Sequence, residues 1–146
     1  LRLCSIHRLI SPLPAHCVVL GYRPNRHNRT GVTRTMFGLT FFSPPLSRTY
    51  ALHYQDGEYV PDLDRVVRAL DRLGRSRFPT RIVGFPSYLW FGLKGMEERG
   101  LRLRLRPGSR ILLAGGWKPH YAQQVDKPVL YDLVRRVPGV AEVHLI

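Results

Sequence analysis

Apolar residues recur every three or four positions from residue 63 onward, which is the spacing of one face of an α-helix. Asp62 or Asp64 can cap the start of this helix, and Gly74 can end it. Just upstream, two short strand-like segments flank Asp56-Gly57, a pair that is typical of two-residue hairpin turns. The pattern therefore predicts a β-hairpin followed by an amphipathic helix.

From residue 80 the pattern alternates between short apolar runs and helical periodicity. We expect strands at 80–84, 110–114 and 143–146, and helices at 86–100 and 125–137. This order, strand, helix, strand, helix, strand, is typical of a parallel sheet with helices on its faces. We therefore predict an α/β fold, in which the loops after Gly84 and Ala114 meet at the carboxyl edge of the sheet.

Two other segments are less legible. Residues 1–47 mix a short apolar run, Val18-Val19-Leu20, with a polar loop, and we assign no element there. Residues 101–105 alternate Leu and Arg with a period of two, which fits either an edge strand or an extended connection.

We treat the chain as one domain in three parts: residues 1–47, a hairpin and helix over 48–79, and a βαβαβ segment over 80–146. The sequence starts at Leu1 and stops inside an apolar run at Ile146. Native termini usually lie in polar sequence. We therefore expect the 146 residues to be an incomplete domain, an internal fragment of a longer protein.

The net charge is +13, with 23 Lys and Arg against 10 Asp and Glu, and 20 of the 23 cations are Arg. Such a charge invites a nucleic-acid interpretation, with Tyr22, Phe37, Phe41 and Phe42 as stacking surfaces for bases. The arginines are spread through every segment instead of forming one basic stretch, which favours a solvated surface that reflects composition. A basic nucleic-acid-binding module is therefore the alternative, and nucleic acid is not the expected partner.

Cysteine and histidine spacing gives no sign of a metal site. Cys4 and Cys17 have no Cys-x-x-Cys neighbour, and the six histidines show no ligand spacing with carboxylates. We expect Cys17, beside Val18-Val19, to be a small buried hydrophobe. No run approaches the roughly 20 apolar residues of a membrane span. These features predict a cytoplasmic protein with no membrane span and no metal ligands of its own.

The segment Gly115-Gly116-Trp117-Lys118 follows a predicted buried strand. Two glycines let the backbone take positive φ or approach a flat ligand closely. Trp117 can stack on a heteroaromatic ring or wall an apolar tunnel, and Lys118 can meet a phosphate or carboxylate. The other interpretation is a tight bend with a partly buried Trp and a solvated Lys, because the spacing matches neither a Walker loop nor a G-x-G-x-x-G fingerprint.

The run from Ser109 to Lys118 resembles the Gly-Gly-Trp-Lys segment of the acyl-protein synthetase (LuxE) family, a branch of the adenylate-forming, AMP-binding ligases. The upstream run from Ile82 to Leu89 is similar to the strand-to-helix corner, G-x-P-S, that precedes it in that family. The likeness is clearest over residues 80–146, weaker over 31–79, and none is claimed for 1–30. It implies that the chain is a segment of the N-terminal domain of an adenylate-forming enzyme.

The resemblance also implies an activity: a fatty acid is activated by ATP to an acyl-adenylate, and the acyl group then passes to a protein thiol. ATP and Mg²⁺ would serve the complete enzyme, and the thiol acceptor could be a partner reductase protein. The nucleotide site would include Gly115, Gly116, Trp117 and Lys118, and the acyl pocket would include Gly84, Phe85, Pro86, Tyr88 and Leu89.

Several parts of the family pattern are missing from the sequence. We find no Ser/Thr/Gly-rich phosphate loop, no Tyr-Gly-x-x-Glu segment and no C-terminal lid with its lysine, so no catalytic residue is assigned. The family's acyl-accepting cysteine lies toward the C-terminal part, so neither cysteine of this chain takes that role. We expect little or no turnover from the isolated chain. A coenzyme A ligase similar to the phenylacetate branch is the nearer alternative within the same class.

Overall fold

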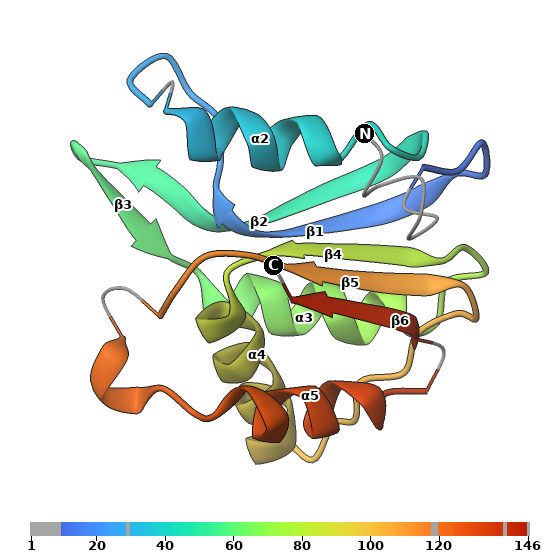
Figure 1. Cartoon of the computed structure of the whole chain (residues 1–146). Coiled ribbons are helices and arrows are strands. Elements are labelled where there is room, and N and C mark those ends of the chain that lie inside the picture. Colours follow the sequence, from blue (N-terminus) through green and yellow to red (C-terminus); the bar gives the residue numbers. More distant parts are fainter. Residues whose placement is uncertain (1–9, 29, 118–119, 139, 146) are drawn as a thin grey trace.

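The computed structural model describes residues 10–28, 30–117, 120–138 and 140–145. Within these residues six strands form one sheet in the order β3-β2-β1-β4-β5-β6, as Figure 1 shows. The strands are β1 (Ala15–Tyr22), β2 (Pro45–Gln55), β3 (Glu58–Pro61), β4 (Thr80–Gly84), β5 (Ser109–Leu113) and β6 (Val140–Leu145). Neighbouring strands are parallel except for the hairpin of β2 and β3.

Helices cover both faces of the sheet (Figure 1). The helices are α2 (Gly31–Leu39), α3 (Leu63–Leu73), α4 (Pro86–Glu98) and α5 (Lys127–Arg135), with a 3₁₀ turn at Tyr121–Gln123. Helix α2 lies on one face, and α3, α4 and α5 lie on the other. This is the layered arrangement that parallel strands require, because both of their faces must be buried.

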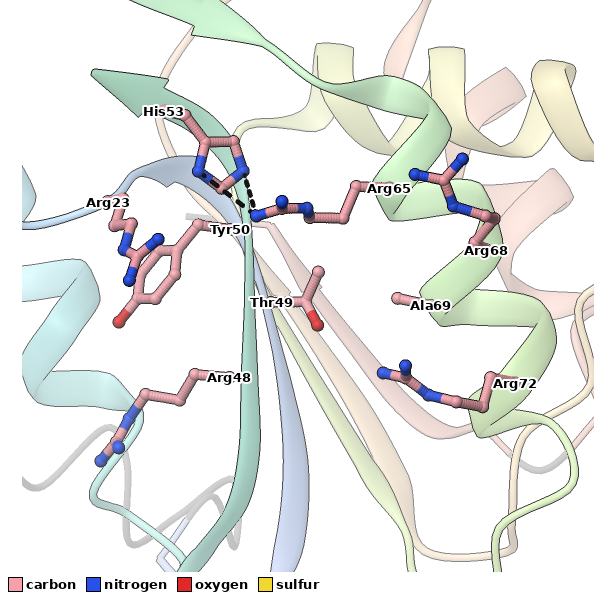
Figure 2. Close-up of a pocket in the computed structure, with 9 residues that line it drawn as sticks. All are labelled: Arg23, Arg48, Thr49, Tyr50, His53, Arg65, Arg68, Ala69 and Arg72. Carbon is pink, nitrogen blue, oxygen red and sulfur yellow. Dashed lines mark hydrogen bonds between the residues drawn. The ribbon is translucent and has the colours of Figure 1, made fainter. Parts of the chain in front are cut away.

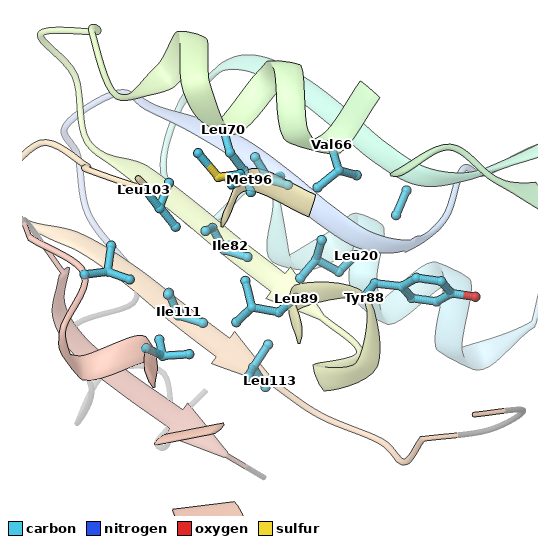
Figure 3. Packing of buried hydrophobic residues seen from close by; sticks show 14 of the residues in the cluster. Leu20, Val66, Leu70, Ile82, Tyr88, Leu89, Met96, Leu103, Ile111 and Leu113 are labelled. Atoms are coloured by element: carbon cyan, nitrogen blue, oxygen red, sulfur yellow. The ribbon is translucent and has the colours of Figure 1, made fainter. Parts of the chain in front are cut away.

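The main hydrophobic core lies between the sheet and the three helices of one face (Figure 3). Leu20, Ile82 and Ile111 from neighbouring strands meet Leu70 of α3 and Leu89 of α4, and all five side chains are fully buried or nearly so. A smaller cluster under α2 consists of Val19, Met36, Tyr50, Val83 and Leu112. The two clusters arise from the alternation of side chains along β1 and β4, where successive residues point to opposite faces.

The predicted hairpin and first helix are confirmed. Asp56 and Gly57 both have positive φ, at 51° and 91°, as a tight two-residue turn requires. The Asp62 carboxylate accepts a hydrogen bond from the Arg65 backbone N–H at 2.9 Å, so Asp62 is the cap of α3, and Gly74 ends the helix. The strand at 80–84 and the alternation of strands and helices after it are confirmed as well, with α5 shorter than predicted at both ends.

The first third of the chain contributes more than its sequence pattern indicates. Val18-Val19-Leu20 lies in β1, which pairs with both β2 and β4 and so sits inside the sheet. Helix α2 was not predicted. The apolar face of α2 is short. Thr30 caps the helix, because its hydroxyl accepts a hydrogen bond from the Thr33 backbone N–H. The chain is therefore an α/β fold in which the hairpin region and the βαβαβ segment are joined by a strand from the poorly legible part.

Residues 101–105 are an extended connection, and the edge-strand alternative for them is wrong. Leu103 and Leu105 still point into the main core, which explains the period of two. The Leu105 backbone N–H donates to the Pro138 carbonyl at 2.8 Å instead of joining a ladder.

Among the described residues, no helix combines the length and the apolar character that crossing a membrane requires.

Candidate functional site

The two corners singled out from the sequence lie side by side at the carboxyl edge of the sheet. Strands β4 and β5 are parallel neighbours, with Gly84 opposite Leu113. The Ala114 backbone N–H donates to the Gly84 carbonyl at 3.0 Å, and the Phe85 N–H donates to the Leu20 carbonyl at 2.9 Å. The ends of β1, β4 and β5 are therefore tied into one edge, as ligand sites of open parallel sheets require.

Gly84 is required by the way β4 turns into α4. Its φ is +132°, which side chains rarely allow, and a Cβ at this position would lie 2.5 Å from the Leu20 carbonyl oxygen. Only glycine can therefore end β4 with this close approach to β1. The next residue, Phe85, turns its ring along the edge and packs at right angles to Tyr22, with 5.9 Å between ring centroids.

Gly115 has φ +87° and lies against the same phenylalanine. A Cβ on Gly115 would be 3.0 Å from two carbons of the Phe85 ring, so the glycine lets the two corners close on each other. Gly115 and Gly116 are both exposed to solvent. The double glycine is therefore exposed backbone next to an aromatic ring, and the positive φ of Gly115 is one of the two backbone roles that the sequence pattern indicated.

Trp117 lies inside the core. Only 5% of its surface is exposed, and its indole meets the Phe91 ring edge to face at 6.3 Å. In this position the indole packs beneath the corner and offers no open face on which a purine could stack. The burial of Trp117 fits the interpretation of this segment as a tight bend. Lys118 falls outside the described residues.

Aromatic side chains form a continuous row along this edge, which the sequence did not reveal. Tyr59 contacts Tyr22 at 4.8 Å between centroids, Tyr22 contacts Phe85, Phe85 contacts Tyr88 at 6.3 Å, and Tyr88 contacts His120 at 5.8 Å. Tyr59 lies in β3 and Tyr22 lies in β1. The sequence pattern did not connect these segments with the corners, because only the order of the strands in the sheet brings them to this edge.

The residues predicted for the acyl pocket divide between the edge and the core. Phe85 is half-buried and faces the edge, whereas Leu89 is fully buried and belongs to the main core with Tyr88. Burial raises the pKa of the Tyr88 hydroxyl, so this group stays neutral at physiological pH. Pro86 is buried at the first turn of α4. The surface that a ligand would meet at this point is therefore the Phe85 ring.

The start of α4 lacks the usual cap. Its N-cap residue is Phe85, whose side chain accepts no hydrogen bond, and Pro86 follows it. The Ser87 hydroxyl is fully buried at this helix start and has no hydrogen-bond partner among the described residues. A buried helix start with an unpartnered hydroxyl is unusual, because uncapped backbone donors and buried polar groups are normally satisfied. Ser87 is a site residue that the sequence prediction omitted, although it belongs to the G-x-P-S corner.

Other candidates from the sequence are structural. Cys17 is buried, and burial raises the pKa of its thiol, so the predicted role as a small hydrophobe is confirmed. Within the described part of the chain, no group of three or more His, Cys, Asp and Glu side chains could hold a metal ion. Cys4 and His7 lie outside the described residues.

Comparison of the sequence and the fold with protein-family models, curated proteins and solved structures gave no match.

Proposed function

We propose that this chain forms the wall of an ATP-dependent acyl-activating ligase that receives the carboxylic acid and the nucleotide. The observation that carries the proposal is the uncapped start of α4, with the unpartnered Ser87 hydroxyl, beside the exposed double glycine. This combination suits a ligand in which an anionic group is bonded to a flat or apolar part. A carboxylate or phosphate oxygen can accept from the helix start and from Ser87, and the exposed backbone of Gly115 and Gly116 would face the rest of the ligand.

The chemistry of the reaction would come from the bound substrates. When ATP is bound, the acid's carboxylate oxygen attacks the α-phosphorus, the bond to pyrophosphate breaks, and a thiol later displaces AMP from the acyl-adenylate. The chain's own residues would bind and orient. The positive end of α4 would favour the negative charge, and the aromatic row around Phe85 would hold the apolar chain. The proposal assigns none of the described residues to Mg²⁺.

Two features adjust what the resemblance implies. Trp117 would act by supporting the corner, because its indole is buried against Phe91. The polar side-chain contact would come from Ser87 instead of Trp117; because the Ser87 hydroxyl is fully buried, the start of α4 would have to open for the ligand to reach it. Both adjustments keep the nucleotide and the acyl chain at the same pair of corners.

The test is calorimetric titration of the chain with acyl-sulfamoyl adenosines of several acyl lengths, which are stable mimics of the adenylate. Ser87→Ala should weaken binding about tenfold or more, because a hydrogen bond to a charged group is lost. Ser43→Ala is the matched control, since the Ser43 hydroxyl is also buried without a partner but lies before β2, away from the corners. Equal binding by wild type and Ser87→Ala, or no binding by wild type, would contradict the proposal.

A further inference from the structure

A second concave surface runs along the outer edge of β2, and five of its nine lining residues are arginines (Figure 2). Its hollow measures about 480 Å³. The lining residues that carry or can gain positive charge are Arg23, Arg48, His53, Arg65, Arg68 and Arg72. Figure 2 shows Arg65, Arg68 and Arg72 descending one side of the hollow from α3, with Arg23 and Arg48 on the other side of β2. We call this surface the arginine groove.

The charge of the arginine groove is left almost uncompensated. The lining includes no carboxylate, and in the described part of the chain only Arg65 of this set has an ion pair, at 3.5 Å from Asp62. Arg65 also lies 3.0 Å from His53 Nε2, and burial, together with the Arg65 charge, lowers the pKa of His53. The five guanidinium groups repel one another, so an anion bound between them would reduce this electrostatic repulsion.

The shape of the groove favours an extended ligand. Strand β2 pairs with β3 only from Leu52 onward, so residues 45–51 form an outer edge without a neighbouring strand among the described residues. The arginines follow this edge on both sides, and α3 supplies Arg65, Arg68 and Arg72 at helical spacing along its length. A linear polyanion could therefore contact several guanidinium groups in succession.

Exposed aromatic rings continue the groove at Arg48. The Arg48 guanidinium lies 5.5 Å from the Phe37 ring centroid and 4.6 Å from that of Phe41. Phe37 is 37% exposed and Phe41 is 58% exposed, which is unusual for two phenylalanines that touch each other. Guanidinium groups for phosphates next to exposed rings for bases are the two parts of a single-strand binding surface. Because Arg48 lies over one face of Phe41, a base would stack on the other face.

We propose that the arginine groove binds single-stranded nucleic acid, with the sugar-phosphate backbone along β2 and α3 and at least one base on Phe41. Phosphates match the planar, bidentate guanidinium groups, and this binding is independent of the ligase proposal because the two surfaces share no residue. An acidic peptide would use the arginines but would leave the exposed surface of the phenylalanines uncovered. A small polyphosphate would fill only part of the row.

Fluorescence anisotropy with a fluorescein-labelled dT12 strand, over a series of salt concentrations, tests this proposal. The charge reversal Arg68→Glu/Arg72→Glu should weaken binding at least tenfold. It should also make the slope of log K against log salt shallower by about 1.4 or more, since each phosphate contact on a single strand contributes about 0.7. The milder Arg68→Gln/Arg72→Gln pair should show the same trend and covers the case in which charge reversal disturbs folding.

Lys127→Glu/Arg136→Glu is the matched control, because it changes the net charge equally on exposed residues at the two ends of α5. The control should leave dT12 affinity within about threefold of wild type. Equal weakening by control and groove variants would mean that net charge alone attracts the strand, and would overturn the proposal.

Phe41→Ala and Phe41→Leu separate nucleic acid from other anions. Both should weaken dT12 binding, by about fivefold to a hundredfold, because stacking on a ring contributes roughly 1 to 3 kcal/mol per base. Unlabelled tripolyphosphate and a twelve-residue poly-glutamate should displace dT12 only weakly. Unchanged affinity in the Phe41 variants, or displacement by either competitor as efficient as by unlabelled dT12, would overturn the assignment to single-stranded nucleic acid.

Discussion

The carboxyl edge around Gly84 and Gly115 and the arginine groove along β2 are built in opposite ways. The carboxyl edge is uncharged in its described corner residues and is fixed by the backbone, with glycines where any Cβ would collide. The arginine groove consists of long, mostly exposed side chains on an open strand edge, and among its described cations only Arg65 has an ion pair.

This difference separates the effects of substitution. At the carboxyl edge a change in side chain alters the packing of β1, β4 and α4, so the stability of the fold and the shape of the site change together. In the arginine groove a charge can be reversed with little effect on the core, because the side chains that change are in water. The measurements below test whether the two regions respond in these two ways.

The largest effect is expected for Gly84→Ala. The φ of +132° and the Cβ position 2.5 Å from the Leu20 carbonyl oxygen should lower the free energy of unfolding by more than about 3 kcal/mol. Gly100→Ala is the control, since Gly100 has φ +69° with no atom near its Cβ position, and should cost about 1 to 2 kcal/mol. Urea denaturation measures both, and equal costs would show that the close approach of Gly84 to Leu20 does not constrain the carboxyl edge.

A smaller effect, dependent on pH, is expected at the amino end of β1. His16 joins Ser47 at 2.8 Å and Ser76 at 2.9 Å, so His16→Ala should cost about 1 to 2 kcal/mol at pH 7.5. Burial, and then the Arg72 charge, lower the pKa of His16. The neutral ring is thus favoured in the folded state, and the His16 contribution is lost as the pH falls below its ordinary pKa.

Urea denaturation of wild type and His16→Ala at pH 7.5 and pH 5 measures this contribution. The difference in stability between the two proteins should shrink at pH 5, because only the wild type has this histidine to protonate. His53 titrates in both proteins and therefore cancels. A difference that grows toward pH 5 would contradict the neutral-histidine assignment.

Ser87→Ala should raise the free energy of unfolding by about 1 kcal/mol, because it removes a buried hydroxyl that lacks a partner. Ser43→Ala should have a similar effect for the same reason. The two variants should then differ in ligand binding alone, as expected where a site sacrifices stability for function. Destabilisation by Ser87→Ala would show that its hydroxyl has a structural partner.

The smallest effect on stability is expected in the arginine groove. Arg68→Glu/Arg72→Glu should change the free energy of unfolding by no more than about 0.5 kcal/mol, because both side chains are exposed and make no ion pair among the described residues. Thermal and urea denaturation measure this change. A loss of several kcal/mol would mean that these arginines support the fold.

The fold was predictable where the sequence pattern reflects local packing. The α3 face, the Asp56-Gly57 turn and the strand at 80–84 each follow from residues near one another in the chain. The placement of β1 between β2 and β4 was not predictable from nearby residues, because its apolar run is short and its partners lie about 30 and 60 residues further along the chain.

The same limit applies to the two candidate surfaces. The meeting of the Gly84 and Gly115 corners was predictable, since carboxyl ends of parallel strands share one edge. The buried position of Trp117 depends on Phe91 of α4, a contact that spacing does not reveal. The arginines are scattered in the sequence, and five of them gather because α3, β2 and the residue after β1 meet in the fold. Charge that is spread along a chain can therefore be concentrated by topology.

The proposed acyl-adenylate site lies where α4 begins and the double glycine follows β5. Amide correlation spectra of the ¹⁵N-labelled chain, titrated with an acyl-sulfamoyl adenosine, locate the ligand directly. The largest changes are expected at the backbone amides of Ser87, Gly115 and Gly116. Changes confined to Thr49, Arg68 and Arg72 in the arginine groove, or an unchanged spectrum at saturating ligand, would contradict the proposed site.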